Sequence, residues 1–282
     1  MEFVIHNINP VILPIFGPIA IRWYGFAYLI GFLITFLLLN NWSKKGIFEI
    51  PTDKISNFIF LFAIFGVFLG GRLGYQLLYN FDVFIKNPLI LFKVWEGGMS
   101  SHGGFIGTII FMLLYAKKEG YSFWNISDHI ALTASLGIAC GRIANFINGE
   151  LWGRVTDVKW AIIFPQEIGL KYGDYNTNLI NQLYMSGVLS PRHPSQIYQA
   201  ICEGFIVFLV LLYFRKTKLA QTPGIISSYY LILYAITRIL VEFFREPDSI
   251  VYFGWMTKGQ LYSLLMFFGG FLIFWKRKKV AV

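Results

Sequence analysis

The feature that most constrains the fold of this chain is a recurrence of long apolar stretches that carry very few charges. Seven such stretches occur, at about residues 19–40, 56–79, 102–116, 126–148, 196–214, 224–245 and 258–275. A bilayer core about 30 Å thick needs roughly 20 apolar residues per helix. With 56% hydrophobic and only 14% charged residues, the chain is too apolar for an ordinary water-soluble domain. We therefore predict an all-α integral membrane protein, a single domain over residues 1–282 built as a bundle of seven transmembrane helices.

The lysines and arginines between these stretches predict the orientation. Twelve lie in short segments on one side of the membrane, and eight are spread through longer connections on the other side. Basic residues concentrate on the cytoplasmic side, so the N-terminus is expected outside and the C-terminus in the cytoplasm. The first basic residue is Arg22, so no positive segment precedes the first stretch, which we interpret as a true span rather than a secretion signal. The net charge of +9 then reflects topology and attraction to anionic lipids, and we predict no nucleic-acid partner.

Two connections on the outer side are long. Residues 80–101 contain the amphipathic segment FDVFIKNPLILFKVW, which we expect to lie in the membrane interface as an arm. Residues 149–195 form the longest connection, and a loop of that length is usually functional or folds as a small unit of its own. We expect it to form a head region, and the sequence leaves open whether it docks a protein substrate or gates lipid entry.

Four arginines, Arg72, Arg142, Arg238 and Arg245, lie inside or at the outer end of the apolar stretches. An arginine at mid-membrane costs about 2.5–3.5 kcal/mol on insertion scales, so it persists where it is paired, hydrated or functional. Packing or snorkelling is the alternative for any one of them. The predicted topology places all four arginines near the outer face. The simplest interpretation is that they belong to one polar site there.

Helical spacing groups the polar residues of two stretches. Tyr234, Arg238, Glu242 and Arg245 recur at intervals of four, four and three residues and share one helix face, as Arg142 and Asn145 do on another helix. Guanidiniums suit a phosphate, which they bind through two parallel hydrogen bonds, and the nearest abundant phosphates are lipid headgroups. The alternative is a structural Arg–Glu–Arg ion network that locks the helix into the bundle.

Six segments resemble those of a known family, and together they cover nearly the whole chain. They are IRWYGFAY at 21–28, GGRLGY at 70–75, EGGMSSHGGFIG at 96–107, GRIANFINGELWGR at 141–154, HPSQIYQA at 193–200 and RILVEFFREPD at 238–248. In these segments the chain resembles the bacterial prolipoprotein diacylglyceryl transferases. The resemblance implies a membrane enzyme of the bacterial inner membrane with its active site toward the periplasm. It also implies transfer of diacylglyceryl from phosphatidylglycerol to the lipobox cysteine of a prolipoprotein, which forms a thioether and releases glycerol 1-phosphate.

The resemblance also implies the site residues. Arg142 corresponds to the family's phospholipid-binding arginine, Arg238 to its second important arginine, and His102 to the histidine of its HGG motif. The other matching positions are expected to bind substrate: Tyr24, Asn145, Glu150, Gly153, Tyr234, Glu242 and Arg245. The pKa of a free imidazole is about 6.5, so a histidine side chain can be neutral near pH 7 and accept a proton. His102 is therefore the candidate base for the thiol. The alternative is that it only hydrogen-bonds lipid or braces its loop.

No metal or cofactor is expected. The four histidines show no metal-ligand spacing, and Cys140 and Cys202 lie within apolar stretches, where we expect them to pack. A transporter or channel is one competing class, but it should place charges at mid-depth on both sides of a pathway. A structural membrane subunit is the other, in which the polar clusters would only join helices. Release of glycerol phosphate from phosphatidylglycerol would discriminate the enzyme from both.

Overall fold

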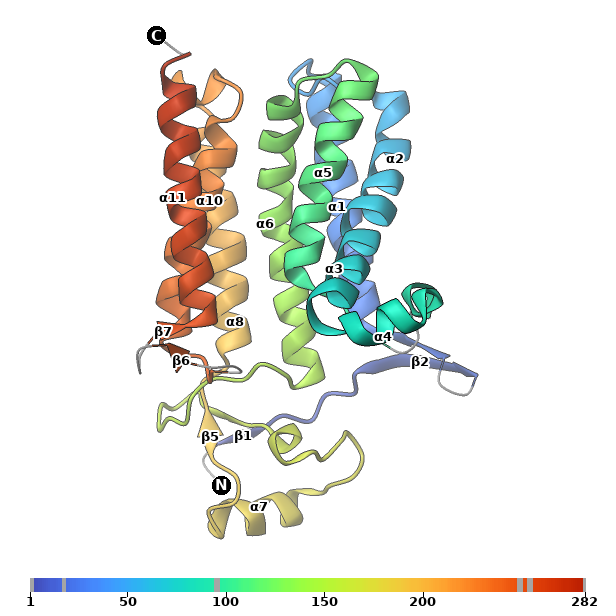
Figure 1. Ribbon diagram of the computed structural model, residues 1–282. Helices are drawn as coiled ribbons and strands as arrows, with labels where there is room; N and C mark the ends of the chain where they lie inside the picture. The colour runs from blue at the N-terminus through green and yellow to red at the C-terminus, as the bar shows by residue number, and fades with distance from the viewer. Residues whose placement is uncertain (1–2, 17–18, 94–96, 248–250, 253–255, 281–282) are drawn as a thin grey trace. The chain divides into compact units, whose positions relative to one another are not determined.

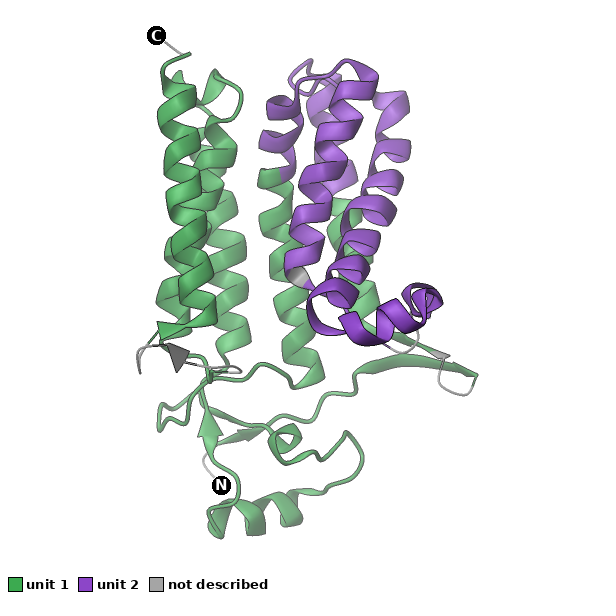
Figure 2. Cartoon of the chain, viewed as in Figure 1, with its two compact units in different colours: residues 1–34, 131–282 green, residues 35–130 purple. Residues whose placement is uncertain are grey.

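The computed structural model describes residues 3–16, 19–93, 97–247, 251–252 and 256–280. The chain divides into two compact units, one formed by residues 1–34 and 131–282 and the other by residues 35–130 (Figure 2). Among these described residues, five helices are long and apolar enough to cross a membrane, namely Trp23–Lys44, Thr52–Tyr79, Phe123–Asn148, Ser195–Phe214 and Ile225–Glu242. This confirms a predominantly helical membrane protein, whereas the total of seven spans stays a prediction.

The unit formed by residues 35–130 contains most of the first half of the chain. Its elements are the second part of α1 (Trp23–Lys44), α2 (Thr52–Leu61), a π-helical segment (Phe62–Phe68), α3 (Leu69–Tyr79), α4 (Phe81–Lys86), a 3-10 turn (Pro88–Phe92), α5 (Ser101–Glu119) and the start of α6 (Phe123–Asn148). Helices α3 and α5 run side by side (Figure 1) and meet at glycines, with Gly74 against Gly103. A methyl group at either position would overlap the facing backbone, so the glycines allow the close approach.

Arg72 in α3 binds the segment that was predicted to form the outer arm. Its side chain is almost fully buried and donates hydrogen bonds to the backbone carbonyls of Leu91 at 3.1 Å, Ile90 at 2.7 Å and Lys93 at 2.8 Å. It also donates to the carbonyls of Gly97 and Gly98, just before α5. Arg72 is therefore a brace for this connection, which is the packing alternative for that arginine.

Replacing Arg72 with alanine is expected to free the connection between α3 and α5. Five backbone carbonyls lose their donor, and since hydrogen bonds to charged groups contribute about 1.5–3 kcal/mol each, we expect at least about 3 kcal/mol of destabilisation. Limited proteolysis of the protein in detergent should then cut residues 80–98 at least tenfold faster than in the wild type. Arg72→Lys, which reaches fewer carbonyls, should fall between the two, and equal cleavage of all three proteins would contradict the bracing role.

The unit formed by residues 1–34 and 131–282 holds the second group of helices. These are the remainder of α6, a continuous helix made of α8 (Ser195–Gln199), a π-helical segment (Ala200–Ile206) and α9 (Val207–Phe214), then α10 (Ile225–Glu242) and α11 (Lys258–Lys278). Helices α10 and α11 lie against each other along their length (Figure 1). Two-residue strands β6 (Val251–Tyr252) and β7 (Met256–Thr257) pair just before α11.

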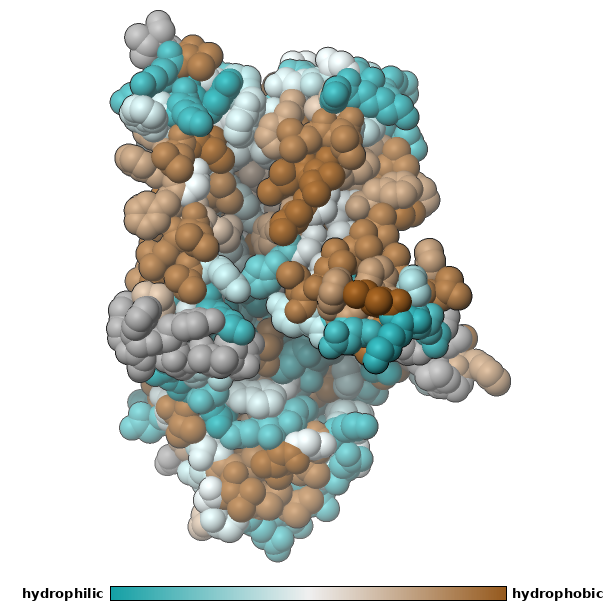
Figure 3. All heavy atoms as spheres, in the orientation of Figure 1, coloured by the Kyte–Doolittle hydropathy of each residue, from teal (hydrophilic) through white to brown (hydrophobic). Residues whose placement is uncertain are grey.

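Large apolar side chains cover the outward sides of these helices. On α11, Leu265, Phe268, Phe271 and Leu272 are each more than half exposed, and the hydrophobic colour of this helix is visible in Figure 3. Polar residues gather near the helix ends instead. An apolar surface of this extent would be unfavourable in water and is suited to lipid.

A small head forms from the N-terminus and the connection before α8. Strands β1 (Val4–Ile5), β4 (Ile162–Ile163) and β5 (Pro191–Arg192) make a three-stranded sheet in the order β1-β4-β5, next to a 3-10 turn (Pro165–Ile168) and α7 (Thr177–Met185). Ile163, Ile180 and Leu189 form its apolar core. His6 is buried there, and desolvation lowers its pKa, so the imidazole is neutral near pH 7.

The all-α expectation is therefore correct for the helices and wrong for these short strands. It is also wrong at the start of the first span, since Ile19–Arg22 forms strand β3 and α1 begins at Trp23. Strand β3 pairs with β2 (Val11–Phe16) in an antiparallel hairpin. The apolar residues of this hairpin look like an extension of the helix in the sequence, because periodicity does not separate a short apolar strand from a helix end.

Candidate functional site

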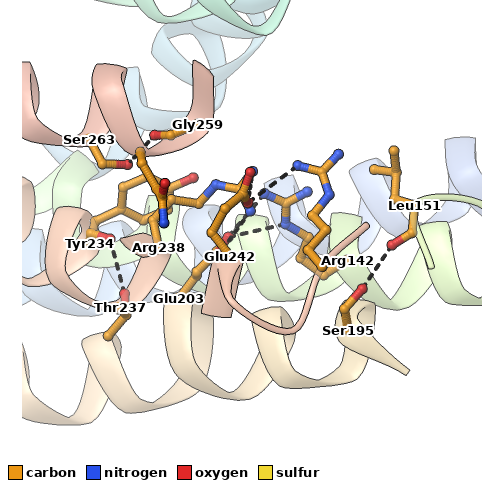
Figure 4. Close-up of polar contacts among 12 residues, drawn as sticks. Arg142, Leu151, Ser195, Glu203, Tyr234, Thr237, Arg238, Glu242, Gly259 and Ser263 are labelled. Carbon is orange, nitrogen blue, oxygen red and sulfur yellow. Dashed lines mark hydrogen bonds and ion pairs between the residues drawn. The ribbon is translucent and has the colours of Figure 1, made fainter. Parts of the chain in front are cut away.

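Two arginines from different helices meet on one buried carboxylate. Glu203, in the π-helical segment after α8, is fully buried and accepts hydrogen bonds from Arg142 of α6 at 3.2 Å (Nε) and 3.0 Å (Nη2). Its other oxygen, Oε1, accepts one from Nη1 of Arg238 in α10 at 3.3 Å. Figure 4 shows these three side chains converging. The guanidiniums of Arg142 and Arg238 therefore meet, as predicted, whereas their position near the outer face stays a prediction.

A second carboxylate extends the cluster along α10. Oε2 of Glu242 lies 3.0 Å from Nη2 of Arg238 and 3.7 Å from Nη1 of Arg245. Its Oε1 accepts a hydrogen bond from the Thr257 hydroxyl at 2.7 Å, and Thr257 also caps the N-terminus of α11. Glu242 thus joins α10 to the start of α11, as the ion-network alternative requires. The ion pairs of Glu242 with Arg238 and Arg245 do not include Arg142, which is connected to them through Glu203.

The charges of this cluster do not cancel. Arg142, Arg238 and Arg245 face two carboxylates, so one positive charge remains. The Arg142 side chain is 18% exposed and the Arg238 side chain 10%, whereas Glu203 is fully enclosed. A net positive cluster that presents its guanidiniums rather than its carboxylates is suited to one singly charged phosphodiester.

Arg142 has a tyrosine partner on another helix. Tyr234, one turn before Arg238 on α10, is buried and hydrogen-bonds with Arg142. Tyr24 lies in the first turn of α1 with its ring 5.5 Å from that of Tyr28, and Tyr28 interacts electrostatically with Arg142. The structure therefore brings Tyr234 directly to the arginine, and Tyr24 packs on Tyr28.

The loop after α6 contributes Asn145 and Glu150. Asn145, one turn beyond Arg142, donates a hydrogen bond to Glu150 Oε1 at 2.7 Å, and Asn148 donates to the same oxygen at 3.4 Å. Gln196 of α8 donates to the Glu150 backbone carbonyl at 2.7 Å. The two polar side chains predicted from the asparagine-rich motif are thus linked to each other and to the helix that carries Glu203.

Gly153 fixes this loop against two other segments. Its N–H donates to the carbonyl of His193 at 2.9 Å, and the next N–H, of Arg154, donates to the carbonyl of Phe244 at 2.9 Å. An added Cβ at Gly153 would lie 2.5 Å from the His193 carbonyl oxygen and 2.6 Å from that of Phe244, so only glycine fits. Gly153 therefore positions the site, with no side chain to touch a substrate. Just before it, Leu151 has a φ of 59°, an unfavourable value for a bulky residue.

His102 belongs to the other unit. It lies in the first turn of α5, where the Ser100 side chain caps the helix by accepting a hydrogen bond from the Gly103 N–H at 3.2 Å. Its role as a base stays a prediction. Over the described part of the chain, no group of His, Cys, Asp and Glu side chains is arranged to hold a metal ion.

Glu203, the residue that joins the two arginines, is not among the site residues predicted from the sequence. A signal was present, because Glu203 is the one acidic residue in the apolar stretch 196–214, and an ionisable residue at such a position indicates function or a buried partner. Thr257 was missed as well, although Thr257 and Gln260 form the Thr-x-x-Gln pattern of a capping box just before an apolar stretch.

Comparison with known proteins agrees with the resemblance. The family model described as prolipoprotein diacylglyceryl transferase matches residues 10–276. A phosphatidylglycerol–prolipoprotein diacylglyceryl transferase of Photorhabdus laumondii is 44% identical over 95% of this chain and 91% of its own length. Proteins of the same name from Photobacterium profundum and Legionella pneumophila are each 42% identical, over 96% of this chain and 94% and 98% of their own lengths.

Proposed function

This chain belongs to the prolipoprotein diacylglyceryl transferase family and transfers diacylglyceryl from phosphatidylglycerol to prolipoprotein, and we propose that Arg142 and Arg238 bind the phosphate of that lipid. The observation that supports this proposal is the buried cluster with one excess positive charge, in which Glu203 orients both guanidiniums. A phosphodiester would compensate that charge and accept hydrogen bonds from the guanidinium N–H groups that Glu203 does not use.

The proposal includes a position in the membrane. The protein lies in the bacterial cytoplasmic membrane with seven spans, its N-terminus outside and its C-terminus in the cytoplasm, as the distribution of basic residues predicts. The arginine cluster then faces the outer leaflet, where a lipid enters sideways with its acyl chains still in hydrocarbon. Residues 80–101 act as the interfacial arm and residues 149–195 as the head on the same side.

The reaction follows from this placement. The thiolate of the lipobox cysteine attacks the glyceryl carbon attached to the phosphate oxygen, so a C–S bond forms as the C–O bond breaks. The electron pair of the broken bond stays on the oxygen of glycerol 1-phosphate, which gains a second negative charge. Arg142 and Arg238 stabilise this charge, and each such donor in a dry site contributes about 10²–10³ in rate. Tyr24, Asn145, Glu150, Tyr234, Glu242 and Arg245 hold the lipid and the arginines in place.

Mixing the purified protein with phosphatidylglycerol and a lipobox peptide tests this function. The expected result is release of glycerol phosphate together with a peptide heavier by one diacylglyceryl group. A peptide with serine in place of the cysteine should give neither product, because the hydroxyl is a far weaker nucleophile at neutral pH. Glycerol phosphate released without modified peptide would contradict transfer and indicate hydrolysis.

We further propose that His102 takes the proton of the attacking thiol. The rise of the wild-type rate with pH should then lie below the range in which a free thiol ionises, near about pH 8.5. His102→Gln should lower kcat by about 10²–10⁴ and move the rise to the range of a free thiol, near about pH 8.5. The measurement is the pH–rate profile of both proteins. An unchanged profile in His102→Gln would exclude the base and leave the bracing alternative.

A further inference from the structure

One buried polar side chain next to the arginine cluster is not used by the proposed mechanism. Gln199, the last residue of α8, is fully buried. Among the residues that the structure describes, neither its Nε2 nor its Oε1 has a hydrogen-bond partner. Burying an amide with both of its polar groups unpaired is unfavourable. A ligand that forms hydrogen bonds with both Nε2 and Oε1 would therefore gain binding free energy at this position.

Gln199 lies on the buried side of its helix. Gln196 lies three residues before Gln199, and Glu203 lies four residues after it. These three fully buried side chains therefore share one helix face. This helix packs against α10 and, at Gly204, against Ala139 of α6. That face is the one from which Glu203 reaches Arg142 and Arg238.

The neighbours of Gln199 fix its level along the helix. Gln196 hydrogen-bonds the Glu150 backbone, and Glu203 binds the two arginines. At about 1.5 Å per residue, the Gln199 backbone is about 6 Å from that of Glu203 along the axis, toward the Glu150 loop. This separation is comparable with the reach of a glycerol unit esterified to a phosphate on the arginines.

We propose that Gln199 binds the headgroup glycerol of phosphatidylglycerol and thereby selects this lipid over phospholipids that lack it. A glycerol headgroup carries two hydroxyls, each a donor and an acceptor, and a carboxamide offers one acceptor and one donor pair that match them. The inference rests on the proposed phosphate site, since the headgroup reaches Gln199 only when its phosphate lies on Arg142 and Arg238.

Gln199→Met, with phosphatidic acid as the comparison lipid, tests the proposal. Phosphatidic acid has the same acyl chains and carries its phosphate as a monoester, without a headgroup glycerol. We expect the KM for phosphatidylglycerol to rise about 10- to 100-fold, the size expected when buried hydrogen bonds to a ligand are lost. The inhibition constant of phosphatidic acid should change less than about threefold. Because methionine fills the same space without polar atoms, the thermal midpoint without lipid should stay equal or rise.

Gln76→Met is the matched control. Gln76 is a buried glutamine of α3, and its Oε1 accepts a hydrogen bond from Asn80 at 2.9 Å. Its replacement should leave the discrimination between the two lipids unchanged. Gln199→Asn keeps the amide but shortens its reach by one methylene, so it should show the same selective loss to a smaller extent and serves if the methionine variant does not fold.

Parallel weakening of both lipids in the Gln199 variants, or an unchanged KM for phosphatidylglycerol, would overturn the proposal. Failure of the phosphate site itself is distinguishable, because phosphatidic acid would then not inhibit the wild-type protein at all.

Discussion

Arg142→Ala is expected to abolish measurable diacylglyceryl transfer, with kcat/KM falling at least about 10²–10³-fold. The substitution removes the guanidinium aimed at the phosphate and lowers the net charge of the cluster from +1 to zero. The protein should still fold, because Glu203 keeps its ion pair with Arg238. Glycerol phosphate release in the presence of a lipobox peptide, together with the thermal midpoint in detergent, measures both effects.

Two further variants separate charge from geometry. Arg142→Lys keeps the charge but loses the planar pair of donors, so it should recover only part of the lost activity. Arg215→Ala removes an arginine just beyond the far end of α9, twelve residues past Glu203 and thus about 18 Å away along the helix, and should leave transfer unchanged. Turnover near the wild-type level in Arg142→Ala would exclude its role in phosphate binding.

The helices that carry this site were predictable because their apolar runs are long. The stretches 126–148, 196–214 and 224–245 correspond closely to Phe123–Asn148, Ser195–Phe214 and Ile225–Glu242. The arginines were equally visible, since a charge in such a run is costly enough to require a reason. The face shared by Arg238 and Glu242 followed from spacing alone, and the ion pair between them at 3.0 Å bears it out.

The partners of those charges were not predictable from local patterns. Glu203 is 61 residues from Arg142 and 35 from Arg238 in sequence, and no periodicity connects positions so far apart. The partners of Arg72 were not predictable from local patterns either. Arg72 lies in an apolar stretch beside glycines, as Arg142 does, but backbone carbonyls surround it. A buried arginine thus indicates that partners exist, and the tertiary structure determines whether they are carboxylates, carbonyls or substrate.

The short strands escaped prediction for a related reason. Strand β1 pairs with β4, and the partners Val4 and Ile162 are 158 residues apart in sequence, with helices α1 to α6 between them. Each strand has two residues, too few for an alternating pattern to emerge. Their register is set by the core of Ile163, Ile180 and Leu189 rather than by strand propensity.

Replacing Glu203 is expected to be the most destabilising single change in the site. Glu203→Ala leaves the guanidiniums of Arg142 and Arg238 facing each other without the carboxylate that separates them. Because Glu242 is then the one carboxylate left for three arginines, the net charge of the cluster rises from +1 to +2. Removing one partner of a buried ion pair typically costs about 3–5 kcal/mol. Transfer should fall at least about 10²-fold even at saturating lipid, because the guanidiniums lose their orientation.

A double-mutant cycle distinguishes this charge effect from loss of packing. If repulsion between the arginines is the cause, Glu203→Ala combined with Arg142→Ala should be more stable than Glu203→Ala alone, since the second change removes an unpaired buried charge. Glu203→Gln should preserve the packing but still lose activity, because an amide cannot hold two guanidiniums by charge. Thermal midpoints and transfer rates of the four proteins in the cycle are the measurement. Strictly additive losses of stability would contradict the coupling, whereas full activity in Glu203→Gln would show that the carboxylate is not what orients the arginines toward the lipid phosphate.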